Sequence, residues 1–228
     1  MRLVAWNANH NVQKRSLEAN AAILDSLSPD IMVISETAPP APENPRGAFF
    51  VGGLPGLAVI AGDGLELHAS PKNEGAATLS AGFGVSGRES FDLLAVWPVS
   101  RRSEPSYHQV LMSVLERFAE LLSSGRAVML GDLNSNTRVV AQRSTHPRFV
   151  QEAARLGLVS AYHRQTGEQH GDESVATYRH GSGDQRDFHL DYCFLSDALA
   201  AQSVIAVDAS RDWFAIGDHR PVVLDAPL

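Results

Sequence analysis

The sequence has a single cysteine, Cys193, among 228 residues. One cysteine excludes an intramolecular disulfide and a zinc cluster built from several thiolates. We expect Cys193 to pack as a small apolar residue inside a strand near the end of the chain. The sequence also lacks any apolar run approaching the roughly 18 residues of a membrane-spanning helix, and its first residues, MRLVAWN, lack the zones of a secretory signal. These absences predict a cytoplasmic protein without a membrane segment.

An excess of positive charge is also missing. The chain has 19 Lys and Arg against 26 Asp and Glu, a formal net charge of −7, and only Lys14 and Lys72 are lysines. A uniformly basic surface for nucleic acid is therefore excluded, and any attraction for an anion must be local. The hydrophobic fraction of 44% and charged fraction of 20% are ordinary for a globular protein. We expect residues 1–228 to form one domain.

The hydrophobic pattern predicts a mixed α and β chain. Leu3–Asn7 and Ile31–Ser35 are apolar strand-like runs, and Leu17, Ala21, Leu24 and Leu27 have helical spacing between them. Residues 37–47 contain four prolines and predict a loop. A helix is predicted over 110–122 and another over 147–156. Further strands are predicted at 57–61, 65–69, 78–84, 91–97, 127–132, 176–178, 189–195, 204–208 and 221–225.

One motif is set aside. Residues 82–87 satisfy G-x-G-x-x-G, but the strand-like run Phe91–Trp97 follows instead of a helix, so no helix N-terminus is available for a pyrophosphate. We expect a hairpin turn there. The sequence contains no Walker A, H-E-x-x-H or G-x-S-x-G motif.

Polar residues stand at one end of each of three predicted strands. Gly131-Asp132-Leu133-Asn134 follows the run 127–130, Glu36 follows Ser35, and Gly217-Asp218-His219-Arg220 precedes the last strand. Carboxylate and amide oxygens presented together are the ligands of hard cations such as Mg²⁺. The pattern predicts phosphate chemistry. Taken singly, Glu36 could be a surface residue, Asn7 a turn amide, and Asp132 with Asn134 an Asx-turn.

Five motifs in order carry a resemblance to a known family. Trp6-Asn7-Ala8-Asn9, Ser35-Glu36-Thr37, Gly131-Asp132-Leu133-Asn134, His189-Leu190-Asp191-Tyr192 and Gly217-Asp218-His219-Arg220-Pro221 together resemble the motif series of the endonuclease/exonuclease/phosphatase superfamily. The resemblance spans residues 6 to 221. It implies an α/β (α+β) four-layer sandwich, with two mixed β-sheets packed face to face and helices on the outer faces. It also implies a divalent-metal-dependent phosphoesterase that hydrolyses phosphodiester or phosphomonoester bonds with Mg²⁺, or with Mn²⁺.

The resemblance assigns expected roles to individual residues. Glu36 would be the principal metal ligand, with Asn7 supporting it and Asp218 reaching the metal. Asp132 would position or deprotonate the attacking water, and Asn134 would bind the phosphate. His219 would also bind the phosphate, with Asp191 holding its other ring nitrogen. Asn9, Arg101 and Arg102 would contact the substrate.

The sequence departs from the family pattern at two positions. Trp97 stands where many relatives have a catalytic His or Tyr, and indole cannot act as a general acid. Tyr107, His108, His163 and His170 are candidate replacements. Asn9 stands where some nuclease relatives have a carboxylate. Two readings therefore stay open: an enzyme acting on nucleic acid, nucleotide or lipid headgroup, or a non-catalytic binding or scaffold protein that keeps the fold. No obligate protein partner is implied.

Overall fold

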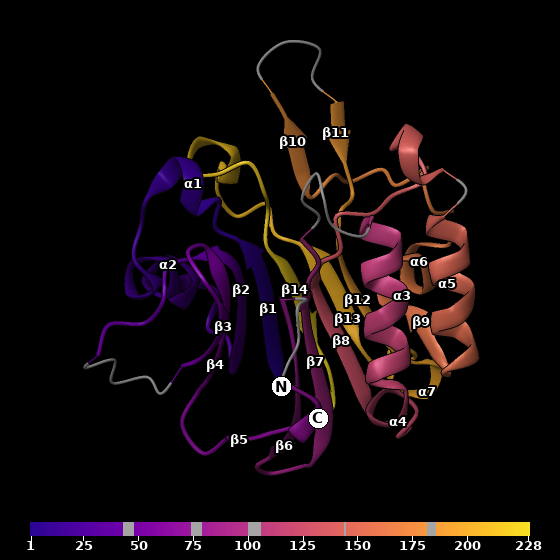
Figure 1. The fold of residues 1–228 in the computed structure, drawn as a ribbon, viewed down its shortest axis with the longest axis horizontal. Coiled ribbons are helices and arrows are strands. Elements are labelled where there is room, and N and C mark those ends of the chain that lie inside the picture. The colour runs from indigo at the N-terminus through magenta and orange to yellow at the C-terminus, as the bar shows by residue number, and fades with distance from the viewer. Residues whose placement is uncertain (43–47, 74–78, 100–105, 144, 182–185) are drawn as a thin grey trace.

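Two mixed β-sheets packed face to face form the centre of the computed structural model, which describes residues 1–42, 48–73, 79–99, 106–143, 145–181 and 186–228 (Figure 1). In the first sheet only β1 and β2 are parallel to each other. Its order is β13 (Val204–Val207), β14 (Val222–Asp225), β1 (Arg2–Asn7), β2 (Ile31–Thr37), β4 (Gly56–Ala61) and β3 (Phe49–Gly52).

The second sheet is built in the same way, with β7 and β8 as its parallel pair. Its order is β5 (Glu66–Ala69), β6 (Leu79–Ser86), β7 (Phe91–Trp97), β8 (Ala127–Asp132), β12 (Asp191–Ser196) and β9 (Leu158–Ser160). A separate two-stranded ribbon, β10 (Tyr178–His180) and β11 (Arg186–Phe188), extends beyond one end of the sandwich (Figure 1).

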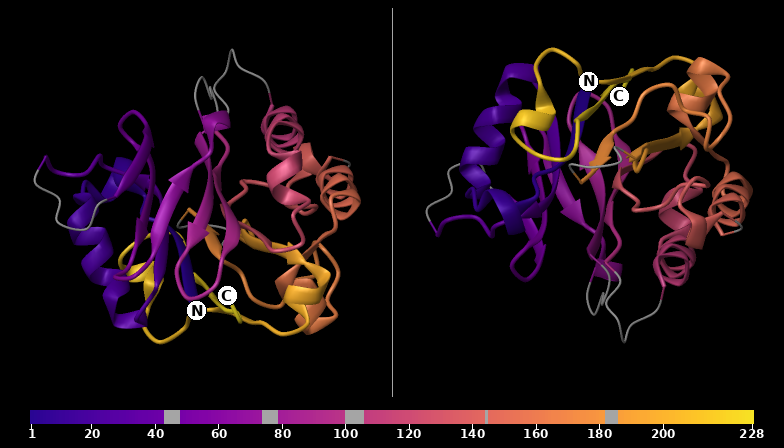
Figure 2. Two further views of the ribbon diagram at one scale, coloured as in Figure 1. Left: turned by 90° about the horizontal axis from the view of Figure 1, so that it is seen from below. Right: turned by 90° about the horizontal axis from the view of Figure 1, so that it is seen from above.

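Helices cover the outer faces of both sheets, and Figure 2 shows the four layers from two further directions. The first sheet carries α1 (His10–Gln13), α2 (Leu17–Leu24) and the 3-10 turn η1 (Asp25–Leu27). The second sheet carries α3 (Tyr107–Arg117), α4 (Ala119–Leu122) and α5 (His146–Arg155). Shorter pieces are α6 (Ala161–Thr166), α7 (Asp197–Ala200) and the 3-10 turns η2 (Pro71–Asn73), η3 (Val140–Gln142) and η4 (Trp213–Ala215).

Alternate residues of the same strand are buried in different layers. Leu3 and Ala5 face the core between the two sheets, whereas Val4 and Trp6 face the layer under α2. In β8, Leu130 faces the central core and Met129 the layer under α3 and α5. Burial on both faces explains why these strands are continuous apolar runs. The predicted four-layer sandwich is confirmed.

Cys193 is fully buried in β12, as predicted. Among the described residues, no helix is both long and apolar enough to cross a membrane.

Three local predictions were wrong. The strand predicted at 176–178 shares only its last residue with β10, which runs from Tyr178 to His180. The apolar stripe over 110–122 belongs to two helices, because the chain leaves helical geometry at Phe118 (φ −104°, ψ 17°) between α3 and α4. The G-x-G-x-x-G segment lies in β6, apart from Gly87, and is not a hairpin turn. Gly82 is needed there because a Cβ atom would lie 2.8 Å from the ring of Phe118.

Candidate active site

The polar residues predicted at strand ends meet at one edge of the sandwich, on the side where the β10–β11 ribbon projects (Figure 1). Asn7 ends β1, Glu36 lies near the end of the parallel strand β2, and Asp132 ends β8. Asp191 begins β12 and is paired with Asp132 across the two antiparallel strands. Both sheets therefore contribute to one site.

Asn7 connects the two sheets. Its Nδ2 atom donates hydrogen bonds to Oε1 of Glu36 (3.1 Å) and to Oδ2 of Asp132 (2.9 Å), and its Oδ1 atom accepts one from the backbone N–H of Asn9 (3.0 Å). Asn7 is 2% exposed, so these bonds form away from bulk water. The amide thus fixes two carboxylates at a set separation.

Asn134 is turned back toward Asp132 instead of continuing the strand. Its backbone N–H donates to Oδ1 of Asp132 (2.8 Å), which is an Asx-type turn, and its Nδ2 atom donates to Oδ2 of the same residue (3.0 Å). Asn134 has φ 49° and Glu36 has φ 48°, so both are in the left-handed region that most residues avoid. Such conformations persist where the surrounding structure fixes them, and they concentrate at functional sites.

Asp191 and His219 form a buried pair. Nδ1 of His219 lies 2.8 Å from Oδ2 of Asp191, and the side chains are 5% and 0% exposed. Burial alone would lower the pKa of His219, but the carboxylates of Asp191, Asp132 and Asp218 together raise it to about 10. The ring is therefore an imidazolium at neutral pH. The main chain of His219 is also fixed, since its carbonyl accepts a hydrogen bond from Nε1 of Trp6 (3.1 Å).

The pKa values of two nearby carboxyl groups are raised. Burial raises the pKa of Asp132 to about 7, with a further contribution from Asp191, and it also raises the pKa of Glu36. A carboxyl group with a pKa near 7 can exchange protons with water at neutral pH.

The donor set fits a hard divalent cation. Asp132, Asp191 and His219 each have one potential ligand atom, and these three atoms lie within 4.8 Å of one another. As an imidazolium, His219 has no free lone pair for a metal, so the carboxylate oxygens are the available ligands. Oδ1 of Asp191 and Oδ1 of Asp218 are buried without a hydrogen-bond partner, which is costly unless a cation or a donor meets them. With Glu36, four carboxylates surround one imidazolium. Oxygen ligands of this kind suit Mg²⁺, with Glu36 and Asp218 as the groups able to hold it and Asn7 orienting Glu36.

The remaining predicted residues do not all lie at the site. Asn9 lies beside Asn7 with φ 48° at the start of α1, and its side chain makes no capping hydrogen bond. Arg101 and Arg102 lie outside the described residues. Trp97 ends β7 and is 5% exposed, packed in the core between the sheets.

Trp97 cannot act as a general acid, and four residues are candidates for that role: Tyr107, His108, His163 and His170. Of these four, only Tyr107 lines a cleft at the site. This cleft, of about 260 Å³, is also lined by Glu36, Trp97 and Asn134. His108, the next residue of α3, lines a different cleft between α3 and α5. His163 and His170 belong to a separate histidine cluster.

Sequence reasoning missed Tyr178 and Thr177. The Tyr178 ring lies 4.7 Å from the His219 ring, and an isolated β-bridge joins the two residues. Burial raises the pKa of Tyr178, and so do Asp218, Asp132 and Glu36. Oγ1 of Thr177 accepts hydrogen bonds from the N–H groups of Leu190 (2.9 Å) and Asp191 (3.0 Å). No motif marks either residue in the sequence, because both contacts are long-range.

A larger cleft of about 640 Å³ opens beside Asn134. Its walls include Tyr107, Arg138, Tyr178, Phe188 and Leu190. The guanidinium of Arg138 lies over the Phe188 ring at 5.9 Å from the centroid. The cleft thus combines aromatic faces with one cation directly next to the site.

Comparison with solved structures agrees with this architecture. The 3' phosphatase NExo from Neisseria, in a structure bound to a product DNA hairpin, matches with TM-score 0.73 and 18% identity over 100% of both chains. An AP endonuclease from Archaeoglobus fulgidus matches with TM-score 0.69 and 17% identity, again over 100% of both chains. The chain has the endonuclease/exonuclease/phosphatase fold.

A third match with this fold is TDP2 from Caenorhabditis elegans, with TM-score 0.70 and 13% identity over 99% of this chain and 74% of that one. No protein-family model matches the sequence, and no curated protein matches it. The likeness is therefore one of structure, and the resemblance that five short motifs predicted is confirmed at the level of the fold.

Proposed function

We propose that this chain is a divalent-metal-dependent phosphoesterase that hydrolyses phosphodiester or phosphomonoester bonds in nucleic acid, with residues 1–228 acting as one domain. The observation that carries the proposal is the buried Asp191–His219 pair facing the Asp132–Asn134 turn, with Asn7 and Glu36 between them. A buried imidazolium beside four carboxylates is expensive to maintain unless it serves a function.

Each side chain has a role that follows from its surroundings. Asp132, with a pKa of about 7, accepts a proton from the attacking water. The imidazolium of His219 and the amide of Asn134 donate hydrogen bonds to the phosphate oxygens, where negative charge increases in the transition state. Asp191 holds the ring in place through Nδ1, so Nε2 is the nitrogen that faces the substrate. A Mg²⁺ ion held by Glu36 and Asp218 would neutralise charge on the phosphoryl group.

Departure of the leaving group needs a proton donor, and Tyr107 is the group we assign. Trp97 cannot supply the proton. Tyr107 lines both clefts that Asn134 also lines, which places this residue next to the proposed phosphate site. The tyrosine comes from the start of α3 instead of from the end of β7.

The large cleft favours nucleic acid over a small soluble ester. Aromatic faces such as Tyr178 and Phe188 can stack on bases or sugars, and Arg138 can contact a neighbouring phosphate. The neighbours named above include a phosphatase bound to DNA and an AP endonuclease, which supports the same substrate class. The surface of this chain is acidic overall, so we expect recognition to be confined to this cleft.

The test is hydrolysis of a 3'-phosphorylated DNA oligonucleotide, plasmid DNA and bis-p-nitrophenyl phosphate with Mg²⁺ or Mn²⁺. Glu36→Gln and His219→Ala should each lower the rate at least about 100-fold. Glu66→Gln and His68→Ala are matched controls, because both residues lie exposed on β5. Equal rates for the wild type and the site variants on every substrate would refute the proposal.

A second candidate is a binding protein that keeps this fold without catalysis. Trp97, buried at the position of an expected catalytic side chain, is the observation that favours it. In that case DNA would bind with an affinity reduced by Arg138→Ala, while no substrate would be hydrolysed with any divalent ion.

A further inference from the structure

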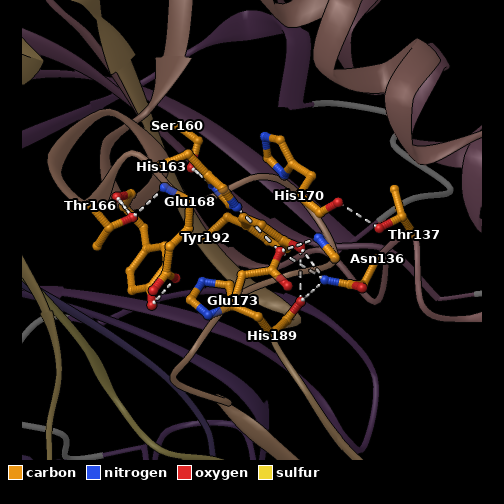
Figure 3. A network of polar contacts seen from close by, with 12 residues as sticks. Asn136, Thr137, Ser160, His163, Thr166, Glu168, His170, Glu173, His189 and Tyr192 are labelled. Carbon is orange, nitrogen blue, oxygen red and sulfur yellow. Dashed lines mark hydrogen bonds and ion pairs between the residues drawn. The ribbon is translucent and has the colours of Figure 1, made fainter.

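A second cluster of metal-binding side chains lies behind the candidate active site, on the other side of β12. His163, His170 and Glu173 each have one potential ligand atom, and these three atoms lie within 4.8 Å of one another. His163 is in α6, and His170 and Glu173 are in the segment that follows it. Figure 3 shows the three side chains gathered around Tyr192 of β12. None of them takes part in the proposed hydrolysis.

We propose that His163, His170 and Glu173 form a zinc site, chemically distinct from the oxygen-ligand site for Mg²⁺. Two imidazoles and one carboxylate are a ligand set that zinc and related transition metals favour, whereas Mg²⁺ prefers oxygen alone. Nε2 of His163 lies 3.2 Å from Oε1 of Glu173. Two ligands on a tetrahedral zinc ion are about 3.3 Å apart, given bonds of about 2.0 to 2.1 Å.

Hydrogen bonds around the three side chains resemble the outer contacts that orient metal ligands. Nδ1 of His163 lies 2.7 Å from Oγ of Ser160, and Nε2, which faces Glu173, is the nitrogen that would bind the ion after losing its proton. Nδ1 of His170 lies 3.0 Å from Nε2 of His146, whose own Nδ1 lies 2.9 Å from Oγ of Ser135. The Nδ1 atoms of His163 and His170 are thus both engaged by a neighbouring side chain.

Glu173 is fixed by two further contacts. Its Oε1 atom accepts hydrogen bonds from Nδ2 of Asn136 (3.0 Å) and from the backbone N–H of Gly171 (3.0 Å) (Figure 3). The side chain is 2% exposed and that of His163 is 9% exposed. Within the described part of the chain, no lysine or arginine pairs with this carboxylate. A buried carboxylate placed against imidazoles in this way is well suited to a cation.

The protonation states agree with metal binding. Burial lowers the pKa of His170 to about 3 and that of His146 to about 4, so both rings are neutral at pH 7. The pKa of Glu173 is lowered to about 2, because hydrogen bonds from His163, Gly171 and Asn136 outweigh the effect of burial. Neutral imidazole and ionised carboxylate are the forms that bind a metal.

Ion binding would move two of the rings. His163 and His170 are stacked, with centroids 3.6 Å apart and an interplanar angle of 23°. The nitrogen lone pair of an imidazole lies in the plane of its ring, so the lone pairs of two stacked rings cannot both point at one ion. The two rings must therefore rotate relative to each other before both can coordinate the same ion. The bound ion would then tie α6 and the segment 170–173 together, next to Thr177, which holds the backbone of Asp191.

The experiment is a Co²⁺ titration of chelator-treated protein, followed by visible absorption, since four-coordinate cobalt with nitrogen ligands absorbs far more strongly than six-coordinate cobalt with oxygen ligands. It is done on the Glu36→Gln variant, in which the oxygen-ligand site is weakened. We expect one strongly absorbing Co²⁺ per chain, displaced by Zn²⁺ but not by excess Mg²⁺.

Adding His170→Gln or Glu173→Gln to that variant should weaken Co²⁺ binding at least tenfold. His68→Gln in the same background is the control and should change nothing, because His68 is exposed on β5. Circular dichroism checks that each variant is folded. If one of the two added substitutions prevents folding, His163→Gln is used in its place in the same Glu36→Gln background. The proposal is overturned if Glu36→Gln binds no strongly absorbing Co²⁺, or if folded His170→Gln and Glu173→Gln variants bind it as tightly as their parent does.

Discussion

His219 and Asp191 are held together from two parts of the chain 28 residues apart, with Nδ1 of the ring 2.8 Å from Oδ2 of the carboxylate. Asp191 starts β12 of the second sheet, whereas His219 precedes β14 of the first. The pair therefore joins the two sheets at the candidate active site, as Asn7 does. Its charge state and its geometry both lead to testable consequences.

Asp191→Asn should lower hydrolysis about 100-fold or more at pH 8. Without the carboxylate, the pKa of His219 falls from about 10, and the imidazolium is lost at a lower pH. The alkaline limb of the pH–rate profile should consequently move to lower pH in the variant. An unchanged alkaline limb would mean that His219 is not the charged group that binds phosphate.

The same pair should make stability depend on pH. The pKa of His219 is raised from 6.5 to about 10 on folding, so its contribution is fully present below pH 6.5 and is lost as pH rises through 10. Urea unfolding should therefore give the wild type a larger free energy of unfolding than His219→Gln. This difference should be largest at pH 6 and should shrink toward pH 10. A difference that grows with pH would contradict this assignment.

The acid limb of the pH–rate profile should report Asp132. Its pKa is raised to about 7, and it must be ionised to accept a proton, so kcat should rise with pH through about 7 in metal-saturated enzyme if the bound ion leaves this pKa in place. Asp132→Asn should remove most of the activity and that limb together. Glu66→Gln, at an exposed carboxylate, should leave both as they are in the wild type.

Tyr107→Phe should slow hydrolysis of DNA about 10- to 100-fold, because an alkoxide leaving group needs a proton. Hydrolysis of bis-p-nitrophenyl phosphate should change much less, since nitrophenolate leaves without protonation. His108→Gln is the matched control, as it replaces the neighbouring residue on α3 that lines another cleft. Equal slowing of both substrates would argue against a general-acid role for Tyr107.

Gly131→Ala should destabilise the fold by at least about 3 kcal/mol. Gly131 has φ 148°, and a Cβ atom there would lie 2.1 Å from the backbone oxygen of Val96 on the neighbouring strand β7. Gly84→Ala in β6 is the control, since its Cβ would meet only the Cβ of His68 at 4.0 Å. Urea unfolding of both variants measures the contrast, and a Gly131 variant as stable as the Gly84 variant would contradict the strand geometry.

Much of the fold could be predicted because burial on both faces leaves a simple pattern. Continuous apolar runs such as Val128–Leu130 predict strands, and the polar residues at their ends predict where a site lies. The structure brings Asn7, Glu36 and Asp132 into hydrogen-bonding contact, although Asp132 belongs to the other sheet. The functional roles assigned to them stay predictions.

Other features depend on contacts between distant parts of the chain. Tyr178 faces His219 only because an isolated bridge pairs them, and no local pattern encodes that bridge. The short strand β9 and helix α6 have too few residues to show a period. The histidine cluster gathers His146, His163 and His170 from α5, α6 and the segment after it, a combination that is visible only in three dimensions.

The place of β1 in its sheet has a consequence for biosynthesis. β1 is hydrogen-bonded on one side to β2 and on the other to β14, with Arg2 opposite Asp225. A ribosome makes β1 before any other strand described here, yet one of its two edges has no partner until β14 emerges about 220 residues later. Until then the nascent chain has an open apolar strand edge that is prone to mispairing. We therefore expect chaperones to associate with this nascent chain until β14 has emerged from the ribosome.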